Sequence, residues 1–173
     1  MSGAGPLQTS FNRYRYGDTK PVVSLDIVSA TVIEIGDMVF QDDSDSDNYK
    51  PASDIGAIPG THATLALAQE AFHDEFVGVS LSRSKDGDTN HVRIATEGVF
   101  EFDCASATFK AGQYVGPDDN AGGTALESQQ VIAVADATKA IGQVEKDYTS
   151  ATTSVLVRIK GVVHSGGVQS VIT

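Results

Sequence analysis

Short runs of alternating apolar and polar residues fill most of the chain, and turn residues separate them. The segment VLVRIK at 155–160 is the clearest example, because valine and isoleucine occupy one set of alternate positions while arginine and lysine fall in the other. Strands place successive side chains on opposite faces, so this alternation predicts half-buried strands. Further strand-like runs fall at 21–28, 31–41, 76–84, 90–96, 98–102, 113–116, 129–136, 140–146 and 161–165.

One segment has helical rather than strand periodicity. In THATLALAQEAFHDEF at 61–76, Leu65, Ala68, Phe72 and Phe76 recur at the spacing of an α-helix and predict one apolar stripe. The helix ends a long insertion, 42–76, whose first part is acidic and contains prolines.

Two phrases of the sequence resemble each other, HVRIATEGVFEF at 91–102 and LVRIKGVVHS at 156–165. The similarity extends upstream, where IEIGDMVFQDD at 33–43 resembles FKAGQYVGPDD at 109–119. The pairs that correspond are Gly36 with Gly112, Gly78 with Gly142, Arg93 with Arg158, and Gly98 with Gly161. We interpret this as a degenerate duplication of a strand–turn–strand unit, with halves at about 31–103 and about 104–165.

The sequence therefore predicts an all-β fold, in which two repeats too small to close a core alone pack into one small barrel or sandwich. The 173 residues suit a single such domain, at 21–173, with the short helix in its insertion and an extended arm at 1–20. Seventeen glycines, together with many Val, Ile and Thr residues in short segments, favour strands joined by tight turns.

The charge balance excludes several classes of partner. With 12 basic and 23 acidic residues, the net charge of −11 repels phosphate backbones and anionic lipid, so we expect neither nucleic acid nor a membrane as partner. A single cysteine and the lack of an apolar leader-like segment at the start favour synthesis in a reducing cytoplasm.

The arm is the one basic and aromatic part of the chain. Phe11, Tyr14 and Tyr16 are interleaved with Arg13 and Arg15. Such a segment is suited to add to the edge of a neighbour's sheet or to lie across a partner's surface, and these five residues are the candidate partner-binding residues. The alternative is a disordered terminus.

The acidic part of the insertion has a weak resemblance to a calcium-binding loop. Asp43, Asp45 and Asp47 occupy alternate positions, and Asp54 falls where such a loop places its last ligand. However, the position that needs glycine is an asparagine, a proline interrupts the loop, and no helix flanks it closely. We therefore expect a solvated acidic loop and no metal or other cofactor.

The remaining reactive residues form no recognisable catalytic set. The four histidines, His62, His73, His91 and His164, have no metal-binding spacing with one another or with Cys104. The aspartate before Cys104 disfavours a thiolate, so a small, partly buried cysteine at a strand end is expected. Arg93 and Arg158 are expected on the solvent faces of their strands. These observations do not indicate an enzyme.

At this point the pattern resembles a known family, the head decoration (structural cement) proteins of tailed bacteriophages. In that family a Gly-Asp-x-Val phrase leads to a Phe/Ile-Gly-Val strand and then to a Glu-Gly-Val-Phe-like strand. An Ala-Gly phrase follows and leads to an Ile-Gly-x-Val strand and a closing Val-Arg-Leu/Ile strand. The segments that carry the resemblance are Gly36-Asp37, Phe76 to Val79, Glu97 to Phe102, Ala111 to Val115, Ile141 to Val144, and Val157 to Ile159. The similarity covers roughly 31–164, whereas the long insertion and the arm have no counterpart.

The resemblance implies a β-barrel on the outer surface of a mature phage capsid, often a homotrimer, that clamps neighbouring subunits of the coat protein. It implies no catalytic residue. A head–tail connector or tail subunit is an alternative, because duplicated β-barrel units occur there too. A carbohydrate-binding β-domain is a weaker alternative, since the chain has no tryptophan for a stacking platform.

Overall fold

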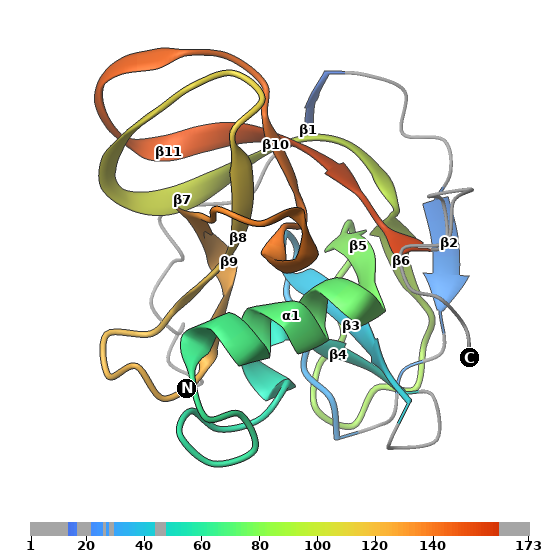
Figure 1. The fold of residues 1–173 in the computed structure, drawn as a ribbon. Coiled ribbons are helices and arrows are strands. Elements are labelled where there is room, and N and C mark those ends of the chain that lie inside the picture. Colours follow the sequence, from blue (N-terminus) through green and yellow to red (C-terminus); the bar gives the residue numbers. More distant parts are fainter. Residues whose placement is uncertain (1–13, 17–21, 26, 28–29, 44–47, 163–173) are drawn as a thin grey trace, which may run out of the picture.

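The computed structural model describes residues 14–16, 22–25, 27, 30–43 and 48–162, and these residues form mostly β-strands (Figure 1). The strands are β1 Tyr14–Tyr16, β2 Val22–Leu25, β3 Met38–Asp42, β4 Asn48–Pro51, β5 Phe76–Ser80, β6 Val92–Ala95, β7 Glu97–Phe109, β8 Tyr114–Asp119, β9 Leu126–Ala133, β10 Gly142–Val144 and β11 Tyr148–Lys160. The helices are α1 Leu65–Glu75 and two short 3-10 helices, η1 Ala52–Asp54 and η2 Ala137–Lys139.

The two sheets repeat one strand order. The first runs β2-β6-β5-β3-β4, and the second contains β7-β11-β10-β8-β9, so each strand of the first has its equivalent five strands later. The second sheet closes into a barrel through parallel pairing of β7 with β9, at Asp103 and Gln130, whereas the described residues of β2 and β4 do not pair with each other. The predicted small all-β barrel is confirmed, and the duplication suggested by the sequence is present in its topology.

Two glycines mark the same turn in both repeats. Gly36 and Gly112 have φ angles of 95° and 80°, in the left-handed region that favours glycine. The Gly36 N–H donates to the carbonyl of Ser80 at 2.8 Å, and the Gly112 N–H donates to the carbonyl of Val144 at the same distance. Each glycine therefore lies in the turn just before a strand, Gly36 before β3, which pairs with β5, and Gly112 before β8, which pairs with β10.

The predicted match between the two arginines is wrong by two positions. The Leu81 N–H donates to the carbonyl of Arg93, and the equivalent Glu145 N–H donates to the carbonyl of Leu156. Arg93 is therefore equivalent to Leu156, not to Arg158. β7, which begins at Glu97, already belongs to the second sheet, so strands of that sheet start before residue 104.

The interiors of the two repeats are built from equivalent apolar positions. In the first repeat the inward-facing residues include Ile33, Val39, Val77, Val92 and Ile94, and their equivalents in the second are Phe109, Val115, Ile141, Val155 and Val157. All ten are almost completely buried. The larger core begins inside the barrel of the second repeat. It continues across the face of the first sheet that lies opposite the first repeat's own interior, and there it meets α1.

The predicted helix at 61–76 is confirmed as α1, although it begins at Leu65 and ends at Glu75. Thr64 caps its first turn by accepting a hydrogen bond from the Leu67 N–H. The helix buries Ala68, Gln69 and Phe72 and lies against strands of both sheets (Figure 1). The insertion of the first repeat therefore holds the two repeats together.

Candidate functional site

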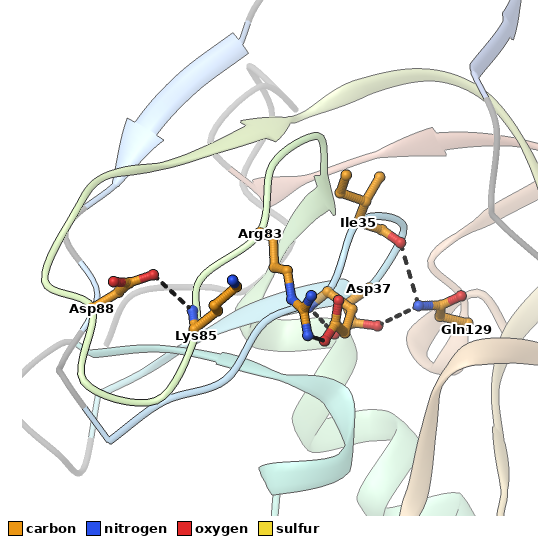
Figure 2. A network of polar contacts seen from close by, with 7 residues as sticks. Ile35, Asp37, Arg83, Lys85, Asp88 and Gln129 are labelled. Atoms are coloured by element: carbon orange, nitrogen blue, oxygen red, sulfur yellow. Dashed lines mark hydrogen bonds and ion pairs between the residues drawn. The ribbon is translucent and has the colours of Figure 1, made fainter. Parts of the chain in front are cut away.

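The turn before β3 is joined to the second repeat by a buried carboxylate. Asp37 Oδ2 accepts a hydrogen bond from the Glu34 N–H at 2.8 Å, and Oδ1 accepts one from Gln129 Nε2 at 2.8 Å (Figure 2). Gln129 Nε2 also donates to the Ile35 carbonyl at 3.3 Å. One side chain of β9 thus holds both the backbone and the carboxylate of a turn that is distant in sequence.

Burial raises the pKa of Asp37, and the hydrogen bonds from Glu34 and Gln129 act in the opposite direction. The equivalent residue of the second repeat is Gln113, whose Oε1 accepts from the Lys110 N–H at 3.0 Å. The same turn is therefore capped by a neutral amide in the second repeat. In the first repeat, the two carboxylate oxygens of Asp37 accept one hydrogen bond each, from the Glu34 N–H of the same turn and from Gln129 of β9.

Further hydrogen bonds connect the insertion to the second repeat. The buried Gln69 Nε2 donates to the Pro117 carbonyl at 2.7 Å, and His73 Nδ1 lies 2.6 Å from the Ala140 carbonyl oxygen. The Ile58 N–H donates to the Thr124 carbonyl, and the Ser53 N–H to the Ser128 hydroxyl. These hydrogen bonds come from α1, from the loop before it and from η1, so they fix the interface between the two repeats along its length. We call this interface the seam.

The outer side of the turn Thr31–Asp37 presents apolar side chains to solvent. Val32 and Ile35 are 43% and 45% exposed, and we call this pair the knob. Figure 2 shows the Ile35 side chain pointing away from Asp37 and Gln129. Beside it, Arg83 pairs with Glu34 at 2.7 Å. The turn is thus held by polar contacts on its inner side and is apolar on its outer side.

A groove of about 460 Å³ lies on the outer surface of the second repeat. Its lining is mostly apolar and comes from α1, η2, β8, β10 and β11; the residues are His73, Tyr114, Ala137, Thr138, Ala140, Ile141, Gly142, Gln143, Arg158 and Lys160. Arg158 is held at one side by a bidentate pair with Glu145, at 2.9 and 2.7 Å. The sequence patterns did not indicate this groove, because it depends on how the insertion packs.

A wider hollow of about 1030 Å³ lies at the turn between β7 and β8. Its lining is formed by the turn at 110–113, by Asp147 and by the adjoining ends of β7 and β11, and Asp147 Oδ1 accepts a hydrogen bond from the Ala111 N–H at 2.9 Å. Tyr148 meets Phe109 edge to face, with ring centroids 6.3 Å apart. Asp147 and the two aromatic rings in the hollow therefore hold the local structure of this turn together.

The predicted arm residues fall largely outside the described part of the chain. Phe11 and Arg13 lie outside it, and only the backbone of Tyr14, Arg15 and Tyr16 is described, as β1. This strand pairs antiparallel with β7 of its own chain, near Val99 and Phe100. The arm's role toward a partner stays a prediction.

The acidic loop is described only at its ends, because Asp45 and Asp47 lie outside the described residues. Asp43 and Asp54 are both exposed. Among the residues that the structure describes, no group of three or more His, Cys, Asp and Glu side chains is arranged to hold a metal ion.

The other reactive residues have structural surroundings. Cys104 is a free, buried cysteine within β7, and burial, together with the charges of Asp103 and Asp118, raises its pKa to about 11. His62 Nε2 lies 3.0 Å from the Ile55 carbonyl oxygen, and His91 is exposed. His164 lies outside the described residues. Arg93 and Arg158 are exposed as predicted.

Glu75, at the carboxyl end of α1, makes stability depend on pH. Burial and the charges of Asp43, Asp42 and Asp74 raise its pKa from 4.5 to about 7. Between these pH values the folded chain holds a proton that the unfolded chain releases, so stability falls as pH rises through this window. The cost at higher pH is about 1–2 kcal/mol, once solvent screening of a half-exposed group is allowed for.

Glu75→Gln is therefore expected to stabilise the fold at about pH 8 and to change little at about pH 4. Urea unfolding of the two proteins across this range measures the difference. Glu127→Gln, at a half-buried glutamate of β9, is the matched control. If Glu75→Gln and the parent chain differ by the same amount at every pH, the account of Glu75 is wrong.

A scan against protein-family models and a search among curated proteins both find no match to this chain. The described part of the chain contains no helix with the length and apolar character needed to cross a membrane.

Proposed function

We propose that the chain is a virion structural protein, a decoration protein that binds the outer surface of a mature phage head and stabilises it by clamping neighbouring coat subunits. The observation that carries the proposal is where the family-like phrases lie. Gly36-Asp37 and Ala111-Gly112 form the equivalent turns before β3 and β8, and the phrases at 76–79 and 141–144 span the equivalent strands β5 and β10. The resemblance thus lies in the repeated scaffold.

The surface properties are consistent with this role. A net charge of −11 keeps many copies soluble and away from packaged nucleic acid. Hydrogen bonds such as those from Gln69 and Gln129 already order the two repeats relative to each other, and an ordered body loses little conformational entropy when it attaches to a shell.

The mechanism of stabilisation would be mass action. A ligand that binds only the expanded shell lowers the free energy of that shell relative to any other state. When several copies attach together, each with its own arm, avidity exceeds the affinity of a single contact by orders of magnitude. In this proposal the coat protein and further copies of the same chain are the partners, and the virion exterior is the location.

The proposal is tested by sedimenting purified, expanded phage shells with the full chain and with a chain that lacks residues 1–20. We expect the full chain to cosediment to saturation and the truncated chain to bind at least tenfold more weakly, because the arm supplies part of the contact. Circular dichroism checks that the truncated barrel is folded. Equal binding of the two chains would contradict the role of the arm, and no binding of either would contradict the proposed function.

A further inference from the structure

One dipeptide of the chain, Asp86-Gly87, combines two residue types whose shared peptide bond is prone to rearrange. The sequence contains it once and contains no Asn-Gly. The nitrogen of the residue after an aspartate can attack the carboxyl carbon of that aspartate and close a five-membered succinimide ring. A side chain on the following residue obstructs this attack, and glycine has none. The sequence therefore favours this dipeptide above every other aspartate of the chain as a place where isoaspartate forms.

The fold places this dipeptide at the exposed tip of the loop between β5 and β6. Asp86 and Gly87 are the two central residues of a tight turn, in which the Asp88 N–H donates to the Lys85 carbonyl at 2.9 Å. Both central residues are exposed. Gly87 has a φ angle of 89°, and a Cβ added to it would meet no heavy atom within 4 Å. Water therefore reaches the reacting atoms, and no neighbouring group blocks formation of the ring.

The Asp86 carboxylate is available for this reaction. Within the described part of the chain, neither this carboxylate nor the Gly87 N–H takes part in a hydrogen bond or an ion pair. The carboxylate of Asp88 is held, because its Oδ2 accepts a hydrogen bond from the first N–H of the turn at 3.1 Å (Figure 2). In the turn between β8 and β9, the amide oxygen of Asn120 is held in the same way by the Thr124 N–H at 2.9 Å. Asp86 thus differs from its neighbours in freedom as well as in the residue that follows it.

The turn can open while the barrel stays folded. Two hydrogen bonds between Ile33 and Ser84, at 3.0 and 2.9 Å, fasten the chain just before the turn. Among the described residues, the turn itself is closed by two hydrogen bonds, both between Lys85 and Asp88. Exposed loops with so few contacts open at a free-energy cost close to zero. Opening lets the aspartate side chain rotate toward the glycine nitrogen without disturbing either sheet.

We propose that Asp86-Gly87 is a site at which the folded chain converts an aspartate to isoaspartate without an enzyme. The Gly87 nitrogen bonds to Cγ of Asp86, and the carboxyl OH leaves with the proton of that nitrogen as water. Water then adds to one of the two ring carbonyls and breaks the bond of that carbonyl to nitrogen. Opening at Cγ restores aspartate, whereas opening at the backbone carbonyl gives isoaspartate. The water released is regained, and nothing is oxidised or reduced.

Isoaspartate changes the shape of this surface but not its charge. The Cβ of residue 86 becomes part of the main chain, which is lengthened by one methylene, and the hydrogen bond between Asp88 and Lys85 can no longer form with its present geometry. The bridge between Ile33 and Ser84 places the altered turn next to the knob. The modified fraction rises with time, so this turn records the age of the molecule. The inference does not rest on the proposed function.

The test keeps the purified full chain folded near neutral pH, at a constant warm temperature, for several weeks. A protease that cleaves after arginine then releases the peptide 84–93, which contains Asp86, Asp88 and Asn90. Electron-transfer fragmentation locates isoaspartate within this peptide. We expect it at position 86, rising with time and about tenfold above position 88. Conversion of Asn90 is distinguished because it releases ammonia and changes the mass, whereas rearrangement of Asp86 leaves the mass unchanged.

Asp86→Glu is the matched control, because it keeps the charge at this exposed position while the longer side chain would have to form a less favourable six-membered ring. Incubated in parallel, it is expected to show no rearrangement at position 86, and circular dichroism checks that it is folded. A synthetic peptide with the sequence of residues 82–91 is the unfolded reference. The folded chain is expected to convert at a rate within about tenfold of that of the peptide, because the turn opens easily.

The inference is overturned if position 88 converts as fast as position 86, since the glycine and the free carboxylate would then have no effect. It is also overturned if the folded chain stays unmodified while the peptide converts, because the turn would then protect the dipeptide. Neither result bears on the proposed function, which is judged by attachment of the chain to shells.

Discussion

Phe72→Ala is expected to destabilise the chain by about 3–5 kcal/mol, the cost of removing a completely buried aromatic ring from a packed core. The Phe72 ring meets Phe40 edge to face at 5.7 Å and Phe76 at 5.6 Å between centroids. It lies on the buried face of the helix that holds the two repeats together, beside Gln69. Its loss therefore leaves a cavity and loosens the seam at the same place.

Urea unfolding at neutral pH measures the Phe72→Ala effect. Leu67→Ala is the control on the same helix, because Leu67 is largely exposed, and its cost should stay within about 1 kcal/mol. In the Phe72→Ala variant we also expect the hydrogen bond from the Gln69 side chain to the Pro117 carbonyl to break at a lower urea concentration than the rest of the fold. A cost for Phe72→Ala as small as that of Leu67→Ala would contradict the role assigned to α1.

Gly78→Ala and Gly142→Ala are expected to destabilise the chain by similar amounts, each about 3 kcal/mol or more. At both positions a neighbouring strand passes so close that an added Cβ would overlap a backbone carbonyl, that of Ala95 or that of Arg158. Backbone cannot move aside without breaking the pairing of β5 with β6 or of β10 with β11. Overpacking against an immobile group of this kind is costly.

Thermal and urea unfolding of the two variants test both the close approach and the equivalence of the repeats. Gly122→Ala is the control, because a Cβ there meets only ordinary contacts, the nearest at 3.5 Å. It is expected to change stability by no more than about 0.5 kcal/mol. If one of the two tested glycines tolerates alanine while the other does not, the repeats are not equivalent at this position.

The sequence predicted the parts of the fold that local physics determines. Alternation identified the strands, and helical spacing identified α1, because burial of one face leaves a period in the sequence. The duplication was visible mainly through glycines. Gly36 and Gly112 occupy turns with positive φ, and Gly78 and Gly142 lie where another strand comes close, so side chains are excluded at these positions.

The sequence misled where the fold places no constraint on residue type. Arg93 and Arg158 looked equivalent because their neighbours are similar, yet both are exposed, and the hydrogen-bond register makes Leu156 the equivalent of Arg93 instead. An exposed position accepts many side chains, so a match there carries little information about register. Matching the Val-Arg-Ile of 92–94 to that of 157–159 therefore places Arg93 two residues out of register.

The seam and the groove could not be predicted from the sequence. Asp37 and Gln129 meet from widely separated segments, and nothing in the sequence near either residue indicates the other. The groove likewise requires α1 to lie beside η2 and β8, which follows from packing of the insertion. Such sites depend on the relative placement of two repeats, whereas periodicity reports only which residues of one element are buried.

The proposed function is tested most directly by counting copies of this chain in phage particles purified from the lysate in which the chain is produced. Quantitative mass spectrometry, with isotope-labelled peptides of this chain and of the coat protein, gives the ratio of the two. A decoration protein is expected in numbers comparable to the coat protein. A handful of copies per particle would instead place the chain in a connector or tail, and its absence from intact particles would contradict a virion role.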